Sequence, residues 1–178
     1  VTANGFKFYE DTGTSTVKIS NSALLVNGVL MTNDASSNFT FENSVVLSMA
    51  TSNGTDDKNQ NAGVLTLVNT TMTYSAAFTN VGNLNIGENS TFTAPSVVNN
   101  GAINFTALSA KLVTLTEGLT IVDQVNNPDY KVVYKEGEGA YQFVEKVYVA
   151  QIGENKYESL QEAVNAAQND ETITLLVD

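Results

Sequence analysis

The sequence predicts an all-β chain: a parallel β-helix solenoid over residues 1–122, followed by a β-hairpin and one short capping helix. Three nearly identical segments carry this prediction, and their glycines, Gly63, Gly82 and Gly101, lie 19 residues apart. After each glycine, apolar and polar residues alternate, as in the pair Leu84 and Ile86. A repeat of about twenty residues with one short strand per copy indicates a solenoid, because each copy buries its apolar face only against its neighbours.

Less regular copies of the same pattern precede these three. Each copy has an alternating apolar pair, usually followed by Asn-Ser or Asn-Thr. The copies begin at Val17, Phe39, Leu65, Leu84 and Ile103, which lie 22, 26, 19 and 19 residues apart. The spacing therefore predicts five stacked coils, of which the first two are the least regular. Short strands of this kind also fit a β-sandwich, which is the structural alternative.

The asparagines after the alternating pairs predict a corner of each coil. Asn43, Asn69 and Asn89 occupy equivalent places in three copies. Asparagine tolerates the left-handed backbone conformation that a tight corner requires. Stacked asparagines can also join their side-chain amides into a ladder along the axis. The alternative is that asparagine is simply frequent in the turns of this composition.

Residues 123–150 predict a β-hairpin that connects the solenoid to the C-terminal segment. Apolar and polar residues alternate in 130–134 and again in 141–144, and the intervening loop 135–139 is rich in glycine. Such a pair of strands is typical of an antiparallel hairpin. Tyr130, Tyr134 and Tyr141 are then cross-strand packing partners. The alternative is that these rings form a platform for stacking sugars.

Residues 151–178 predict a helix followed by a strand. Ser159 and Glu162 form a capping box at the start of the helix. One apolar stripe follows at helical spacing: Leu160, Ala163, Val164 and Ala167. We expect the helix to end at Asn169-Asp170, to pack on the hairpin or on the last coil, and to be followed by a strand at 172–177.

Composition limits the function classes. The net charge is −11 and all eight basic residues are lysines, which disfavours nucleic acid and anionic membrane surfaces as partners. The chain has no Cys, His or Arg, so disulfides, thiolate or histidine catalysis and arginine clamps are excluded. No apolar run approaches eighteen residues, so we expect no membrane insertion. These absences favour a protein that is not an enzyme.

Two sets of residues are candidate sites. Asp56 and Asp57 lie in the longest step between copies and could bind Ca²⁺, the one cofactor considered; the alternative is a solvated loop. Threonines separated by one residue recur twenty positions apart, which predicts a binding surface on adjacent coils: Thr71, Thr73, Thr91 and Thr93. The alternative is that threonine is common here for its strand propensity. Acidic pairs such as Glu136 and Glu138 are attributed to solvated turns.

The coils over residues 15–122, with their N-x-G-x-Φ-x-Φ pattern (Φ apolar), resemble right-handed parallel β-helix proteins, the pectin-lyase-like adhesin-type surface proteins of gut bacteria. Residues 148–178 resemble a motif of such proteins in which a helix of the form Ser-Leu-x-Glu-Ala-Val-x-Ala-Ala opens a β-helix and covers its apolar end. The helix here therefore either opens a following module or closes the present solenoid.

The resemblance implies a non-catalytic structural or adhesive module of a bacterial cell-surface protein. Its expected partners are host glycans or matrix proteins and other modules of the same longer chain. The chain has no initiator methionine or signal peptide, so we expect either a mature product or a segment cut from a longer exported protein. One alternative is a carbohydrate-active enzyme or its glycan-binding appendage. The other is a spacer without a ligand.

Overall fold

The computed structural model describes residues 2–3, 14–27, 32–33, 35–49 and 59–176. The chain divides into two compact units. The first comprises residues 1–127 and 132–143, and the second comprises residues 128–131 and 144–178. The first unit is a β-solenoid of about five turns, as the sequence predicts.

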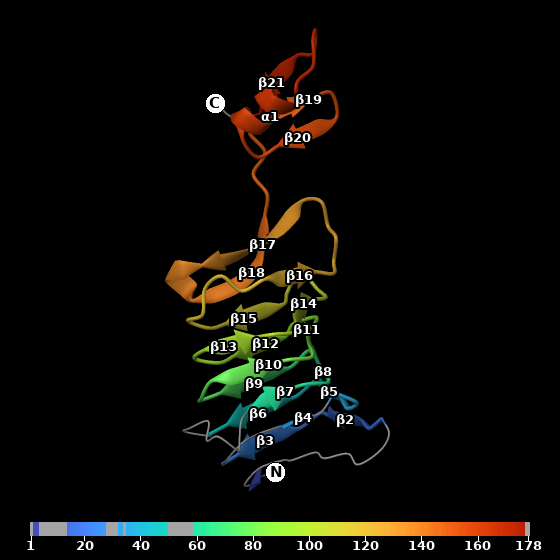
Figure 1. Cartoon of the computed structure of the whole chain (residues 1–178), viewed down its shortest axis with the longest axis vertical. Coiled ribbons are helices and arrows are strands. Elements are labelled where there is room, and N and C mark those ends of the chain that lie inside the picture. The colour runs from blue at the N-terminus through green and yellow to red at the C-terminus, as the bar shows by residue number, and fades with distance from the viewer. Residues whose placement is uncertain (1, 4–13, 28–31, 34, 50–58, 177–178) are drawn as a thin grey trace. The chain divides into compact units, whose positions relative to one another are not determined.

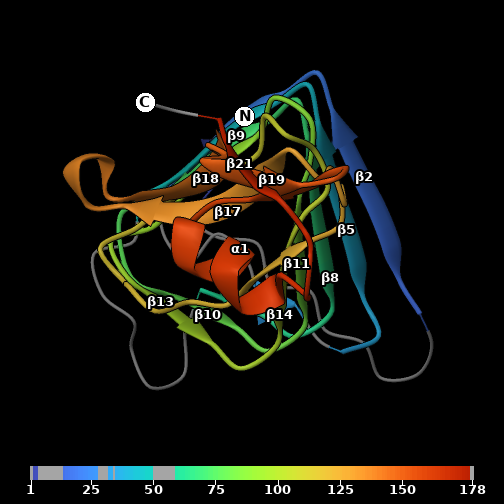
Figure 2. The same ribbon diagram turned by 90° about the horizontal axis from the view of Figure 1, so that it is seen from above.

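Three sheets form the sides of the solenoid (Figure 1). Sheet A contains, in spatial order, β1 (Thr2–Ala3), β3 (Ala23–Val26), β6 (Val45–Ser48), β9 (Thr71–Tyr74), β12 (Thr91–Thr93), β15 (Lys111–Val113), β18 (Ala140–Glu145) and β17 (Tyr130–Lys135). Sheet B contains β13 (Val97–Asn99), β10 (Phe78–Asn80), β7 (Gln60–Asn61) and β4 (Thr32–Asn33). Sheet C contains β16 (Ile121–Asp123), β14 (Ala102–Phe105), β11 (Asn83–Ile86), β8 (Val64–Val68), β5 (Asn38–Glu42) and β2 (Thr16–Ser20). Viewed end-on, β2, β5 and β8 lie along one side of the coil and β10 and β13 along another (Figure 2).

The register of sheet C confirms the predicted copies. Its parallel strands place the predicted first residues opposite one another, in the order Val17, Phe39, Leu65, Leu84 and Ile103. The series continues to Ile121, so the repeat reaches one strand further than Ile103. Parallel pairing between consecutive copies is the arrangement of a solenoid, so the alternative of a β-sandwich is wrong.

The core is a stack of apolar side chains from successive coils. In β5, β8 and β11 of sheet C the alternation buries one side. Leu65, Leu67, Leu84 and Ile86 are fully buried, as is Phe105 of β14. A cluster of rings fills the side near sheet A, where Tyr74 lies 4.9 Å from Phe78 between ring centroids. Each such buried side chain contributes roughly 1.5–3 kcal/mol.

One corner of the coils is built by the predicted asparagines. Asn43, Asn69 and Asn89 all adopt positive φ, near 48–49°, and Asn21 adopts the same conformation at 51°. The Asn69 Nδ2 donates to the Asn43 Oδ1 at 2.7 Å, so the predicted amide ladder is confirmed for this pair. The corner therefore selects asparagine for its backbone conformation.

The residue after each corner asparagine forms a second ladder, of hydroxyl groups. The Ser44 Oγ accepts from the Ser22 N–H, the Thr70 Oγ1 from the Ser44 N–H, and the Ser90 Oγ from the Thr70 N–H, at 3.2–3.3 Å. Each of these hydroxyls donates to the carbonyl two residues earlier. The Asn-Ser and Asn-Thr pairs of the sequence thus satisfy backbone groups that the corner removes from the sheets.

The predicted hairpin is confirmed as β17 and β18, joined by the 3₁₀ turn η1 (Glu136–Glu138). Strand β18 pairs antiparallel with β15, with Leu112 opposite Tyr141. The hairpin therefore extends sheet A and protects the edge that β15 would otherwise expose.

The second unit contains a small sheet and the helix. Sheet D has the order β20 (Asn155–Tyr157), β19 (Ala150–Ile152) and β21 (Ile173–Leu175), all antiparallel. Helix α1 (Leu160–Ala166) begins at Ser159 with the predicted capping box. The helix ends at Ala166, short of Asn169, because Ala167 adopts an extended conformation. Strand β20 was not predicted.

The apolar stripe of the helix is buried only in part. Ala163 is fully buried and packs with Ala150 and Ile152 of sheet D. Leu160 and Val164, which belong to the predicted apolar stripe, are 47% and 51% exposed. We expected contacts with the hairpin or the last coil; the hydrophobic contacts of α1 lie with sheet D. The three short strands of sheet D are too small to bury more of the seven-residue helix than Ala163.

Candidate functional site

The threonine face (Thr71, Thr73, Thr91 and Thr93) lies on the outward side of sheet A. Strands β9 and β12 pair in register, which places Thr71 opposite Thr91 and Thr73 opposite Thr93. The alternate residues, Met72 and Phe92, are fully buried. Because neighbouring strands are about 4.8 Å apart, the four side chains form a flat two-by-two array. The structure thus brings these predicted residues together.

The neighbouring coils surround this face with different side chains. The preceding strand, β6, places Val45 and Leu47 in line with Thr71 and Thr73. Val45 is 58% exposed, so this border is apolar and accessible. The following strand places Lys111 opposite Thr91 and Val113 opposite Thr93. The face therefore presents hydroxyls between an apolar border and a cation.

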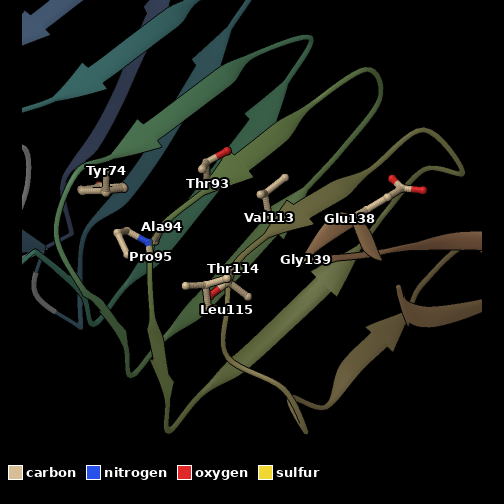
Figure 3. Close-up of a pocket in the computed structure, with 9 residues that line it drawn as sticks. All are labelled: Tyr74, Thr93, Ala94, Pro95, Val113, Thr114, Leu115, Glu138 and Gly139. Atoms are coloured by element: carbon tan, nitrogen blue, oxygen red, sulfur yellow. The ribbon is translucent and has the colours of Figure 1, made fainter. Parts of the chain in front are cut away.

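A pocket of about 210 Å³ adjoins the threonine face (Figure 3). It lies where the coils turn after β9, β12 and β15, beside the turn η1. The residues that line it include Tyr74, Thr93, Pro95, Val113, Leu115 and Glu138. Leu115 is 79% exposed, whereas Tyr74 is only 1% exposed. The pocket thus has buried and accessible apolar walls, with one carboxylate.

Glu138 is held in place by donors on three sides. The Lys111 Nζ donates to its Oε2 at 2.8 Å, and the Lys135 Nζ lies 3.5 Å from its Oε1. The Gln142 Nε2 also donates to Oε1, at 3.2 Å. The hydrogen bond from Lys111 holds the pKa of Glu138 below its usual value, so the carboxylate is ionised near neutral pH. The sequence predicts a solvated turn here, and the Glu138 side chain is 44% exposed in spite of these contacts.

Tyr74 carries an unusual polar group. Its hydroxyl is the one buried side-chain polar atom without a hydrogen-bond partner among the described residues. Burial raises the pKa of Tyr74, because the phenolate form would lose its hydration. The ring itself packs against Phe78 and Phe92.

The hairpin tyrosines serve packing. The Tyr134 and Tyr141 ring centroids are 4.8 Å apart. The Tyr141 hydroxyl accepts from the Leu119 N–H at 2.8 Å and donates to the Thr116 carbonyl at 3.2 Å. These contacts confirm the interpretation of Tyr134 and Tyr141 as packing partners. Tyr130, the third residue of that prediction, is half-buried.

The calcium candidates Asp56 and Asp57 lie outside the described residues. Within the part of the chain that the structure describes, no three Asp or Glu side chains come together as a metal site. No described helix has the length and apolar character to cross a membrane.

Sequence reasoning missed a buried asparagine ladder. The Asn61 Nδ2 donates to the Asn80 Oδ1 at 2.9 Å, and the Asn80 Nδ2 donates to the Asn99 Oδ1 at 2.8 Å. These asparagines are the first residue of the N-x-G-x-Φ-x-Φ pattern, but a ladder was predicted only for Asn43, Asn69 and Asn89. Their 19-residue spacing, which equals that of the glycines, is the signal that indicates the second ladder. The pocket left no comparable signal, because its walls come from three coils and the hairpin turn.

Comparison with known proteins gave no match to a family model, a curated protein or a solved structure. The function is therefore inferred from the β-solenoid and from the geometry of its threonine face.

Proposed function

We propose that the chain is a non-catalytic structural and adhesive module of a bacterial cell-surface protein. Its contact surface is the threonine face, and its ligands are host glycans or matrix proteins. The observation that carries this proposal is the register of β9 and β12, which aligns four threonines on one flat, outward side.

A flat array of hydroxyls supports weak and repeated binding. Each neutral hydrogen bond contributes about 0.5–1.5 kcal/mol, so the four threonines together suit a modest affinity. Modules that recur along a surface would raise this affinity through multivalency. The ladders of Asn43 with Asn69 and of Asn61 with Asn80 tie neighbouring coils together, which suits a rigid support for such a face.

The residue types of the sequence also support a non-catalytic role. Without His, Cys or Arg, acid–base or nucleophilic chemistry would depend on carboxylates, lysine, tyrosine or hydroxyls. The carboxylate of Glu138 is engaged by Lys111, Lys135 and Gln142. This arrangement fixes a charge in place and suits binding.

The experiment compares binding of the chain to arrays of immobilised glycans and matrix proteins. Thr71→Ala/Thr91→Ala removes two hydroxyls of the face, which we expect to cost about 1–3 kcal/mol and to weaken binding about 5- to 150-fold. Neither residue lines the pocket. The matched control is Thr40→Ala/Thr66→Ala, an aligned pair on the outward side of sheet C.

Binding that is lost equally in both double variants would contradict a role for the threonine face. A chain that binds neither glycans nor matrix proteins would be a spacer, and the adhesive proposal would then be wrong.

A further inference from the structure

The pocket beside the threonine face has walls suited to a small ring with an apolar side. Pro95, Val113 and Leu115 supply apolar surface from two consecutive coils, and the Tyr74 side of the pocket is buried (Figure 3). Leu115 is 79% exposed, which leaves most of its side chain available for contact. A volume of about 210 Å³ is below the 300–1,000 Å³ typical of sites for drug-sized molecules, so it suits a single ring.

The polar group of the pocket is the Glu138 carboxylate, which its donors hold in a fixed orientation. The Glu138 carboxylate has about four lone-pair positions, and Lys111, Lys135 and Gln142 address three of them. A bound hydroxyl can donate to the remaining position. Thr93, which belongs to the threonine face and lines the pocket, adds a hydroxyl that both donates and accepts.

The local charges favour a neutral ligand. A cation near Glu138 would be opposed by Lys111 and Lys135, whereas an anion would be opposed by Glu138 itself. Neutral hydroxyl groups avoid both penalties and use the free acceptor capacity of the carboxylate. A sugar ring combines such hydroxyls with a face of C–H groups that packs on aliphatic side chains.

We propose that this pocket binds one neutral hexose-type residue of a glycan, with its C–H face on Leu115 and Val113 and a hydroxyl donating to Glu138. The proposal rests on the glycan-binding part of the proposed function. It assigns the selective contact to the pocket and leaves the threonine face as the surrounding surface.

The test is a titration of the isotopically labelled chain with the methyl glycosides of glucose, galactose and N-acetylglucosamine, followed by two-dimensional NMR. We expect saturable shifts of the backbone amides of Val113, Leu115 and Gly139 with at least one glycoside. Glu138→Gln should weaken binding by at least about tenfold, because a hydrogen bond to a charged group is lost. Leu115→Ala should weaken it as well.

Two controls match these variants. Glu117→Gln removes an exposed carboxylate that does not line the pocket, and Leu108→Ala shortens a leucine that is 38% exposed elsewhere. Both should bind the glycosides as the unchanged chain does. Because Leu115 and Glu138 are accessible, the variants should keep the amide spectrum of the folded chain.

The two proposals fail separately. Shifts that cluster away from the pocket, or no shift with any glycoside, would overturn the pocket assignment. Loss of array binding in Thr71→Ala/Thr91→Ala would support the threonine face even then. Equal glycoside affinity in Glu138→Gln and Glu117→Gln would overturn the role of the carboxylate, whatever the array shows.

Discussion

Gly82 lies so close to Gly63 of the preceding coil that a Cβ at residue 82 would come within 2.0 Å of the Gly63 carbonyl oxygen. Gly101 stands in the same relation to Gly82, at 2.1 Å. At Gly82 and Gly101, therefore, the backbone of the preceding coil leaves no room for a side chain. This contact explains why the residue is glycine at both positions.

Gly82→Ala should therefore destabilise the solenoid strongly. The obstructing atoms belong to the backbone and cannot rotate away, so neighbouring coils must separate locally. We expect the free energy of unfolding to fall by several kcal/mol, on the order of 3 or more. Urea unfolding followed by circular dichroism measures this change.

Gly137→Ala is the matched control for this substitution. A Cβ at residue 137 would meet no atom within 4 Å. We expect its unfolding free energy to stay within about 0.5 kcal/mol of the unchanged chain. Equal losses in the two variants would show that the crowding at Gly82 is not what limits the coil.

Most of the solenoid could be predicted because its information is local and repeated. The alternation that begins at Leu65 and Leu84 selects which side of each strand is buried, and the equal spacing aligns the copies. Asn43 and Asn69 are predictable as corner residues because a left-handed conformation restricts the residue type at one position. Each of these predictions needs only a short window of sequence.

The remainder depended on contacts between segments that are distant in sequence. The pocket exists because Ala140 pairs with Val113, which brings Glu138 beside the coil corners. No periodic pattern encodes that antiparallel pairing. The exposure of Leu160 and Val164 likewise depends on the small size of sheet D, which helical spacing does not reveal.

Asn80→Asp should be severely destabilising. The Asn80 side chain is fully buried, and its Nδ2 donates to the Gly82 and Ala102 carbonyls and to the Asn99 Oδ1. Aspartate has the same shape, and its Oδ1 would still accept from the Asn61 Nδ2, but its second oxygen would face these three acceptors without a donor. A buried charge without a partner of opposite charge costs about 3–5 kcal/mol, which thermal unfolding would register as a large decrease in Tm.

The control for this change is Asn83→Asp, an exposed position three residues later. We expect that variant to unfold within about 0.5 kcal/mol of the unchanged chain. Comparable stability of Asn80→Asp and Asn83→Asp would contradict the buried amide ladder.

Thr70→Val should weaken the hydroxyl ladder. The Thr70 Oγ1 accepts from the buried Ser44 N–H, and valine leaves this donor without a partner. The expected loss is about 1–3 kcal/mol in the free energy of unfolding. Thr71→Val, at the next and exposed position, should change it by less than about 0.5 kcal/mol. If urea unfolding shows the two variants to be alike, the ladder does not contribute to stability.

Tyr74→Phe should stabilise the protein. The substitution keeps the ring that packs on Phe78 and Phe92 and removes a buried hydroxyl that has no hydrogen-bond partner. The relief of that desolvation should raise the free energy of unfolding by about 1–3 kcal/mol near neutral pH. Tyr134→Phe is the matched comparison: it removes a hydroxyl that donates to the Thr114 carbonyl, so it should lower stability by about 0.5–1.5 kcal/mol.

The same variant should respond differently to alkaline pH. Because burial raises the pKa of Tyr74, the folded chain keeps a proton that the unfolded chain releases above the ordinary tyrosine value of about 10. This difference in proton binding therefore leaves the free energy of unfolding of the unchanged chain constant below about pH 10. As the pH rises beyond this value, it lowers that free energy by at most about 1.4 kcal/mol per pH unit. Tyr74→Phe lacks the titrating group, so its advantage in urea unfolding should grow between about pH 9 and about pH 11. An advantage that stays constant over this range would mean that Tyr74 ionises equally in both states, and lower stability than the unchanged chain near neutral pH would show that its hydroxyl has a bonding partner.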